Sequence, residues 1–89
     1  MAAHSPSSLA LLRRTQVQQE SGLSRSTLYL RIAQGLWPKP VRLGSRSVGW
    51  PAGEVAALNA ARISGKSDAE VRTLVSELAA GRLALAERG

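Results

Sequence analysis

In the first third of this chain the sequence predicts two short helices that are joined by a turn of about three residues. Thr15 and Gln18 have the spacing of a capping box, and the helix that they predict ends about two turns later, at Gly22. Ser24 then supplies the N-cap of a second helix, which is expected to run to about residue 34, where Gly35 ends it. Two short helices with such a turn are typical of a helix-turn-helix, although an ordinary helical hairpin has the same spacing.

The segment after this helix pair changes from helical to extended character. Pro38 and Pro40 exclude a helix and favour an extended residue before each of them. Residues 41–43 and 47–50 flank a Gly-Ser-Arg loop at residues 44–46, which predicts a β-hairpin, or wing. Side chains alternate along a strand, so one apolar set is expected to face the core and Arg42 to point away from it. That apolar set is Val41, Leu43, Val48 and Trp50.

Two further helices are predicted after the wing. Pro51 suits the first turn of a third helix, which ends at Ser64-Gly65-Lys66. Ser67 and Glu70 have the spacing of a second capping box, and a final amphipathic helix follows, expected to be interrupted or frayed at Gly81. The buried stripe of the third helix is Val55, Leu58 and Ala61. The apolar stripe of the final helix is Val71, Leu74, Val75 and Leu78.

These elements predict a mainly α-helical chain with a small β-hairpin wing. The expected architecture is a winged helix-turn-helix in a single domain, with an extra C-terminal amphipathic helix. We expect a disordered leader at residues 1–8, the winged domain at 9–63 and the final helix at 67–89. Within the domain, the apolar residues 9–12 are expected to pack on the core as an irregular strand. The final helix either packs on the domain or offers its apolar stripe to a second copy or to another protein.

Positive charge is concentrated in the first two thirds of the chain. The protein has 12 Lys and Arg against 6 Asp and Glu, which gives a formal net charge of +6. Residues 9–62 hold eight of the basic side chains and two of the acidic ones, and most of the basic side chains are arginine. A solvated basic surface is one explanation. The planar fork of arginine also pairs with phosphates and guanine edges, so nucleic acid is the expected partner, ahead of a membrane.

The composition argues against several classes of chemistry. The chain has no cysteine, and its single histidine, His4, has no metal-binding partner nearby, so neither a disulfide scaffold nor a zinc site is expected. Asp68 and Glu70 are the only close acidic pair, and helix capping explains them better than acid–base catalysis does. No apolar run is long enough to span a bilayer, and no secretion signal is visible. We expect a cytoplasmic protein that is not an enzyme and uses no cofactor.

The second helix has the side chains of a recognition helix. At 100° per residue Leu28 and Ile32 face the core, whereas polar side chains gather near the N-terminus of the helix. Helices that enter a major groove present their N-terminal residues to base edges. The expected contacts are Arg25, Ser26, Thr27 and Tyr29, with Arg25 as the candidate for guanine. Two alternatives stay open, since Tyr29 could pack in the core and Thr27 could only support the helix.

Basic side chains also surround the predicted wing. Arg46 at its tip is expected to reach an adjacent minor groove, and Arg42 and Lys39 to hold the DNA backbone. A solvated surface charge explains Lys39 equally well. Trp37 and Trp50 are expected in the core, because each stands next to a proline and the chain has no phenylalanine. The alternative is that they stack on bases.

Three separated motifs follow one another at compatible spacing. They are Gly22-Leu23-Ser24-Arg25-Ser26-Thr27-Leu28-Tyr29, Gly35-Leu36-Trp37-Pro38-Lys39-Pro40-Val41-Arg42-Leu43-Gly44 and Ser47-Val48-Gly49-Trp50. In this order they resemble the AlpA family of phage-type regulators over about residues 11–62. Trp37 stands where the family has Phe, and Glu54 matches an acidic position. The resemblance implies a MerR-like winged helix-turn-helix that binds DNA through recognition-helix residues 24–29, which include Ser24. The implied wing residues are 42–47, which include Ser45 and Ser47.

The resemblance also implies a role. Members of the family control prophage or mobile-element genes, and related small proteins act as excisionases. We therefore expect an excisionase that binds and bends double-stranded DNA near an attachment site in the bacterial nucleoid, with an integrase and further copies of the chain as partners. The alternatives are a dedicated transcriptional regulator and a protein-interaction module that works through the final helix. A chain this short has no room for an effector domain, so no small-molecule ligand is expected.

Overall fold

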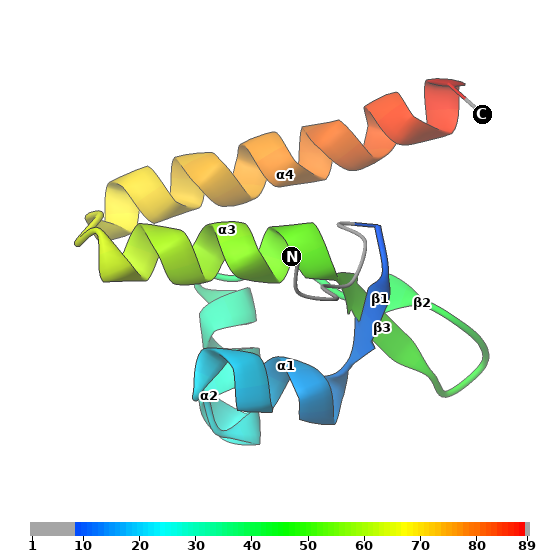
Figure 1. Ribbon diagram of the computed structural model, residues 1–89, viewed down its shortest axis with the longest axis horizontal. Helices are drawn as coiled ribbons and strands as arrows, with labels where there is room; N and C mark the ends of the chain where they lie inside the picture. Colours follow the sequence, from blue (N-terminus) through cyan, green and yellow to red (C-terminus); the bar gives the residue numbers. More distant parts are fainter. Residues whose placement is uncertain (1–8, 89) are drawn as a thin grey trace, which may run out of the picture.

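The computed structural model describes residues 9–88, so the leader expected at residues 1–8 lies outside the described residues. In chain order the elements in this range are β1 (Leu11–Arg13), α1 (Arg14–Ser21), α2 (Arg25–Ala33), β2 (Val41–Arg42), β3 (Val48–Pro51), α3 (Ala52–Ile63) and α4 (Asp68–Arg88). Helices α1 and α2 with the β2–β3 hairpin form a winged helix-turn-helix, and α4 follows as an additional helix (Figure 1). The expected fold class is confirmed.

The small sheet has β3 at its centre. β3 pairs antiparallel with β1 on one edge and with β2 on the other. The apolar patch at the start of the described chain forms β1, in which Leu12 lies opposite Trp50. The backbone N–H of Ala52 donates to the carbonyl of Ala10 at 2.7 Å, which extends this pairing to the first residue of α3. The wing is therefore joined to the helices through its inner strand.

The prediction that the hairpin has a single apolar face was wrong. Val41 lies opposite Gly49, and residues directly opposite each other in antiparallel strands share a face. In this register odd-numbered residues of one strand lie opposite odd-numbered residues of the other. Val41 and Leu43 therefore lie on the face of Gly49, and Val48 and Trp50 lie on the opposite face, toward the core.

The same register corrects the expectation for Arg42. This residue lies opposite Val48, so it is on the core-side face of the sheet and not on the outer one, although its side chain is exposed at the sheet edge. Leu43 instead covers the bare backbone of Gly49 on the outer face. A Cβ atom at Gly49 would lie 2.9 Å from Cδ1 of Leu43 and 3.2 Å from the carbonyl oxygen of Leu12, so only glycine fits this position unless Leu43 and the strand shift.

Two tryptophans lie in the centre of the core. Trp50 is fully buried and Trp37 is 2 % exposed, which confirms the expectation that they fill the core. The indole Nε1–H of Trp50 donates to the carbonyl of Pro38 at 2.8 Å and joins β3 to the segment after α2. The other fully buried side chains of the largest size are Leu28, Leu58, Val17 and Val55. Every helix of the winged domain thus contributes at least one of them.

The two helices of the helix-turn-helix begin with different caps. The side-chain oxygen of Gln16 accepts a hydrogen bond from the backbone N–H of Arg13 at 2.8 Å, so α1 begins before Thr15 and the predicted Thr15 capping box was wrong. The expected cap of α2 is confirmed, because Oγ of Ser24 accepts a hydrogen bond from the backbone N–H of Thr27 at 3.2 Å. Between them Gly22 ends α1 with a φ of 74°, a left-handed conformation that glycine adopts readily.

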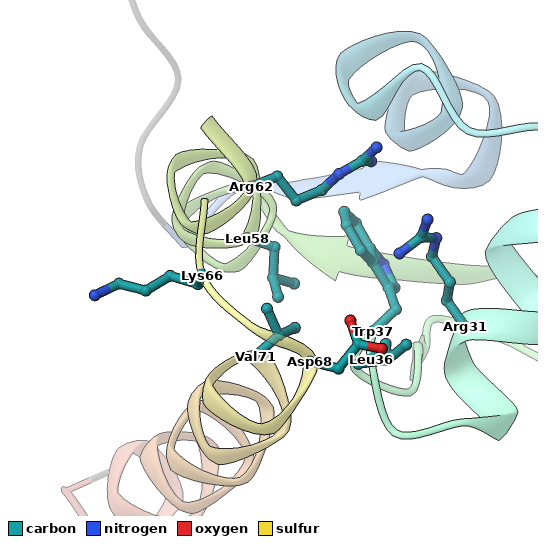
Figure 2. Close-up of a pocket in the computed structure, with 8 residues that line it drawn as sticks. All are labelled: Arg31, Leu36, Trp37, Leu58, Arg62, Lys66, Asp68 and Val71. Atoms are coloured by element: carbon teal, nitrogen blue, oxygen red, sulfur yellow. The ribbon is translucent and has the colours of Figure 1, made fainter. Parts of the chain in front are cut away.

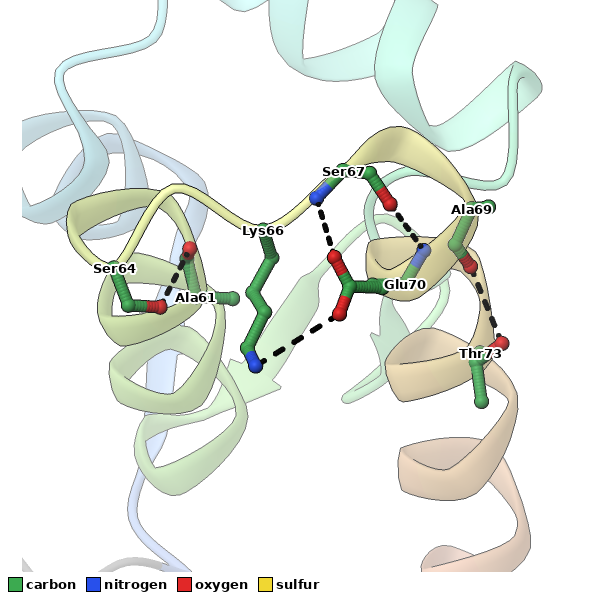
Figure 3. A network of polar contacts seen from close by, with 7 residues as sticks. All are labelled: Ala61, Ser64, Lys66, Ser67, Ala69, Glu70 and Thr73. Carbon is green, nitrogen blue, oxygen red and sulfur yellow. Dashed lines mark hydrogen bonds and ion pairs between the residues drawn. The ribbon is translucent and has the colours of Figure 1, made fainter.

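The turn between α3 and α4 ends in the predicted second capping box (Figure 3). The N–H of Ser67 donates to Oε1 of Glu70 at 2.9 Å, and the N–H of Glu70 donates to Oγ of Ser67 at 3.2 Å. These two bonds and the nearby ammonium of Lys66 lower the pKa of Glu70. Helix α4 is continuous through Gly81, so the expected interruption there was wrong. The cost of one glycine is about 1 kcal/mol, which the alanines and leucines around it offset.

Helix α4 lies along α3 (Figure 1). Its N-terminal part also reaches the C-terminal end of α2, where Nε of Arg72 donates to the carbonyl of Gln34 at 3.0 Å. Val71 is part of the buried core, and Leu74, Val75 and Leu78 pack against it. Farther along, Arg82 forms a two-point ion pair with Glu54 of α3, with N–O distances of 2.8 and 2.6 Å. Glu54 is only 7 % exposed, so this pair satisfies a carboxylate that the protein has removed from water.

We expect Arg82→Ala to lower the free energy of unfolding by about 2–4 kcal/mol, because it leaves the Glu54 carboxylate buried and unpaired. Urea unfolding followed by circular dichroism measures this loss. Lys66→Ala is the matched control, since it removes an exposed ion pair whose contribution is at most about 0.5 kcal/mol. The double variant Glu54→Leu with Arg82→Leu is expected to recover most of the stability, and a single Arg82→Ala loss no larger than that of Lys66→Ala would contradict the assignment.

Candidate nucleic-acid interface

The N-terminal half of α2 presents a mixed polar and apolar face to solvent. Arg25 and Ser26 are exposed. Tyr29 is 40 % exposed, which excludes the alternative that its side chain packs in the core. Thr27 is half-buried, and its Oγ1 accepts a hydrogen bond from the hydroxyl of Ser24 at 2.9 Å. Ser24 and Thr27 thus hold each other at the start of the helix, which favours the supporting role for Thr27. Arg25 and Tyr29 are exposed, and so is Ser26, whose hydroxyl lies 3.4 Å from that of Ser24.

Sequence reasoning missed one residue of this face. Leu30 is 56 % exposed and lies four residues after Ser26, on the same side of the helix. An exposed leucine beside Arg25 and Ser26 is the type of side chain that contacts the methyl group of thymine in a major groove. The spacing from Ser26 to Leu30 was the available signal, but an apolar residue inside a helix is more often assigned to the core.

A basic hollow lies where the wing meets the start of α1. It has a volume of about 210 Å³, and its lining combines arginines and hydroxyl groups from three different elements of the fold. The lining residues are Arg13, Arg14, Thr15, Arg46, Ser47 and Val48. This lining contains three guanidinium groups and no carboxylate, a composition that attracts phosphate.

The sequence predicted only part of the residues that line this hollow. Arg46 and Ser47 were expected in the wing, but nothing in the local pattern links them to Arg13 and Arg14 more than thirty residues earlier. The β1–β3 pairing brings them together, because it places Arg13 opposite Gly49 in the central strand. Arg14 is partly engaged, since its Nη1 donates to Oε1 of Gln18 at 2.7 Å.

The rest of the wing is open to solvent. The N–H of Leu43 donates to the carbonyl of Ser47 at 2.8 Å and closes the loop, which leaves Ser45 and Arg46 exposed at its tip. Lys39 and Arg42 are exposed as well. Figure 1 shows the wing loop and the α1–α2 pair extending from the same side of α3, opposite α4. Both candidate contact regions thus lie on one side of the molecule.

The four side chains expected as a partner face lie elsewhere. Val71 is buried, and Leu74, Val75 and Leu78 are half-buried against the core of their own chain. Their packing is that of a helix docked on the domain, which is the alternative left open by the sequence.

Among residues 9–88, no group of three or more His, Cys, Asp or Glu side chains is placed to hold a metal ion. A membrane-spanning candidate is also absent from that range, because none of its helices combines the required length with the required apolar character.

Comparison with known proteins gives a consistent result. Residues 10–62 match the family described as prophage CP4-57 regulatory protein (AlpA). A relative, the uncharacterized protein ORF88 of Enterobacteria phage P4, is 46 % identical over 55 residues, which span 62 % of this chain and 62 % of that protein. The similarity therefore covers less than two thirds of the relative. No solved structure matches significantly. The family match contains β1, the helix-turn-helix, the wing and nearly all of α3, and it excludes α4.

The basic hollow predicts a specific salt response. We expect Arg13→Ala and Arg46→Ala each to reduce the slope of log K against log salt by about one unit for duplex DNA, because each removes one positive charge that displaces counterions from the DNA. Fluorescence anisotropy at several salt concentrations measures the slope. Lys66→Ala, which removes a cation from the α3–α4 turn, is expected to leave the slope unchanged. Equal slopes for all three variants and the parent would show that phosphate does not occupy the hollow.

Proposed function

Because the chain belongs to the AlpA family of prophage regulatory proteins, we propose that it is a sequence-specific DNA-binding protein that acts as an excisionase of a prophage or integrative element. The observation that supports DNA binding is the basic hollow beside the wing, together with the exposed polar side chains at the start of α2. The wing and α2 extend from the same side of α3 (Figure 1). This arrangement suits simultaneous contact with a major groove and with the phosphates beside it.

In this proposal α2 reads the base sequence. Its first residues enter the major groove, where Arg25 donates two hydrogen bonds to a guanine edge and Ser26 and Tyr29 contact neighbouring bases or phosphates. Leu30 contacts a thymine methyl group. Ser24 and Thr27 hold the first turn in the conformation that the other side chains need.

The wing supplies affinity and position. Arg46 reaches the adjacent minor groove, which attracts arginine most strongly where it is narrow. Arg42 and Lys39 hold the backbone, with the hydroxyls of Ser45 and Ser47 beside them. Arg13, from β1, adds a phosphate contact on the helix side of the wing. These contacts depend little on base sequence, so they strengthen specific and nonspecific binding alike.

The size of the recognition unit favours binding in several copies. A single winged helix-turn-helix such as that of residues 9–63 makes few base contacts. Several copies bound to adjacent sites would contact more DNA and bend it, which is what the assembly of a recombination complex needs. A recombinase of the integrase type is the proposed protein partner, and the proposed site of action is the bacterial nucleoid.

A dedicated transcriptional regulator is the second candidate. The printed description of the matching family is that of a regulatory protein, which favours this role independently of any recombinase. Both roles use the same DNA-reading surface, so they differ in the location and number of binding sites.

A footprint of the purified protein across its genomic neighbourhood separates the two roles. Tandem protected sites beside an integrase attachment site are the expected result and indicate an excisionase that forms a bent nucleoprotein assembly. A single protected site over a promoter, with none near the attachment site, would contradict the excisionase role and leave the regulator.

We expect Arg25→Ala to weaken binding to the protected site by about 1–3 kcal/mol and to relax the preference at one base pair, because it removes a bidentate contact. Competition binding with single-base variants of the site measures both effects. Arg42→Ala is the matched control, since loss of a backbone contact weakens binding to all sequences equally. If Arg25→Ala also weakened specific and random DNA equally, Arg25 would not read a base.

A further inference from the structure

A second polar hollow lies at the junction of three helices, away from the N-terminal turn of α2. It has a volume of about 240 Å³ and is formed by the last turns of α2 and α3, the first turn of α4 and the segment that follows α2. Leu36, Leu58 and Val71 give it an apolar floor (Figure 2). The sequence patterns predicted no site here, because the lining residues come from separate segments of the chain between Arg31 and Val71.

Two side chains that line this hollow carry a buried N–H donor for which residues 9–88 provide no acceptor. Trp37 is 2 % exposed, and its Nε1–H is buried without a partner. The Nε–H of Arg31 is buried without a partner as well. The contrast with Trp50 is direct, since the Nε1–H of that indole donates to the Pro38 carbonyl. Buried donors are normally satisfied, so these two point to an acceptor that enters from outside the chain.

The charges around these donors favour an anion. Figure 2 shows the indole of Trp37 between the side chains of Arg31 and Arg62. The side chain of Lys66 points away from the indole, and its ammonium lies 3.9 Å from Glu70. Asp68 is the carboxylate in this lining, so two guanidinium groups face one negative charge.

The size of the hollow limits what the anion can be. Pockets for drug-sized molecules measure about 300–1,000 Å³, and this hollow is smaller, so it favours a small ligand or a single side chain. A planar carboxylate matches the fork of arginine, and the apolar floor suits a short hydrocarbon stem. A DNA phosphate fits less well, because the phosphodiester has a bulky sugar on each side and no apolar stem.

We propose that this hollow binds a carboxylate carried on a short apolar stem. The Nε1–H of Trp37 and the Nε–H of Arg31 donate to its oxygens, and Arg62 pairs with its charge. A free organic acid and a glutamate side chain of another polypeptide have this same chemistry. The site needs no separate effector domain, since the helices of the winged domain and α4 form it together. It is independent of the proposed contact with DNA.

The two indole N–H resonances in a ¹⁵N-labelled sample test the proposal. Trp37→Phe keeps an aromatic ring, removes one resonance and so assigns the other to Trp50. Butyrate represents the free acid, and N-acetyl-glutamate N-methylamide represents the side chain of a polypeptide. We expect the Trp37 resonance alone to shift, with saturation and a Kd on the order of 1 mM for such small ligands.

Three variants distinguish a built site from adventitious contact. Arg62→Gln, at an exposed position, is expected to weaken binding roughly tenfold, and Asp68→Asn to tighten it, because it removes the opposing negative charge. Arg25→Gln, on the DNA-reading face, is the matched control and is expected to leave the Kd unchanged. The Trp50 resonance reports in each variant that the core is folded.

The outcomes are separable. Butyrate binding without binding of the blocked glutamate assigns the site to a free acid, and the reverse assigns it to a polypeptide. No saturable shift with either ligand, or an equal shift with neutral butyramide, would overturn the proposal. A Trp37 shift with duplex DNA but with neither acid would instead make the hollow part of the DNA surface and overturn it too. Loss of DNA binding in Arg25→Ala tests the proposed function separately.

Discussion

The hydrogen bond from the Trp50 indole to the Pro38 carbonyl joins the two elements that carry the proposed DNA contacts, α2 and the wing. Trp50 lies in the central strand of the sheet, and Pro38 lies in the segment that leads from the recognition helix to the wing. Since Trp50 is fully buried, the bond is shielded from water and the two segments are held at one separation. The bond therefore helps to hold the wing in place relative to α2, and the proposed contact with two grooves depends on that placement.

Local chemistry predicted much of this fold. The Ser24 cap, the Gly22 stop and the Ser67–Glu70 capping box are interactions within four residues, so their sequence spacing is nearly sufficient to identify them. The position of the β-hairpin was predicted for the same reason, but the prediction of which side chains lie on its core-side face was wrong. Which side chains point inward depends on register, and register depends on a third strand and on a glycine that leaves room for Leu43.

Long-range pairing explains what the sequence did not reveal. Arg13 contributes to the wing site only because β1 pairs with β3, and Arg82 meets Glu54 only because α4 lies along α3. Neither pair has a characteristic spacing. Helical periodicity was enough to predict that Arg25 and Ser26 are exposed on α2, whereas Leu30 was missed because its exposure depends on how α2 is placed against the rest of the core.

The pairing of Glu54 with Arg82 shows that the end of the family match and the end of the packed structure are at different positions in the chain. Similarity to the AlpA family ends at residue 62, before α4 begins, yet α4 supplies Val71 to the core and the cation that neutralises Glu54. A fragment trimmed to the conserved segment would keep every proposed DNA contact and expose part of its interior. For this chain the segment that matches the family is smaller than the packed core, and recombinant fragments are best designed to include α4.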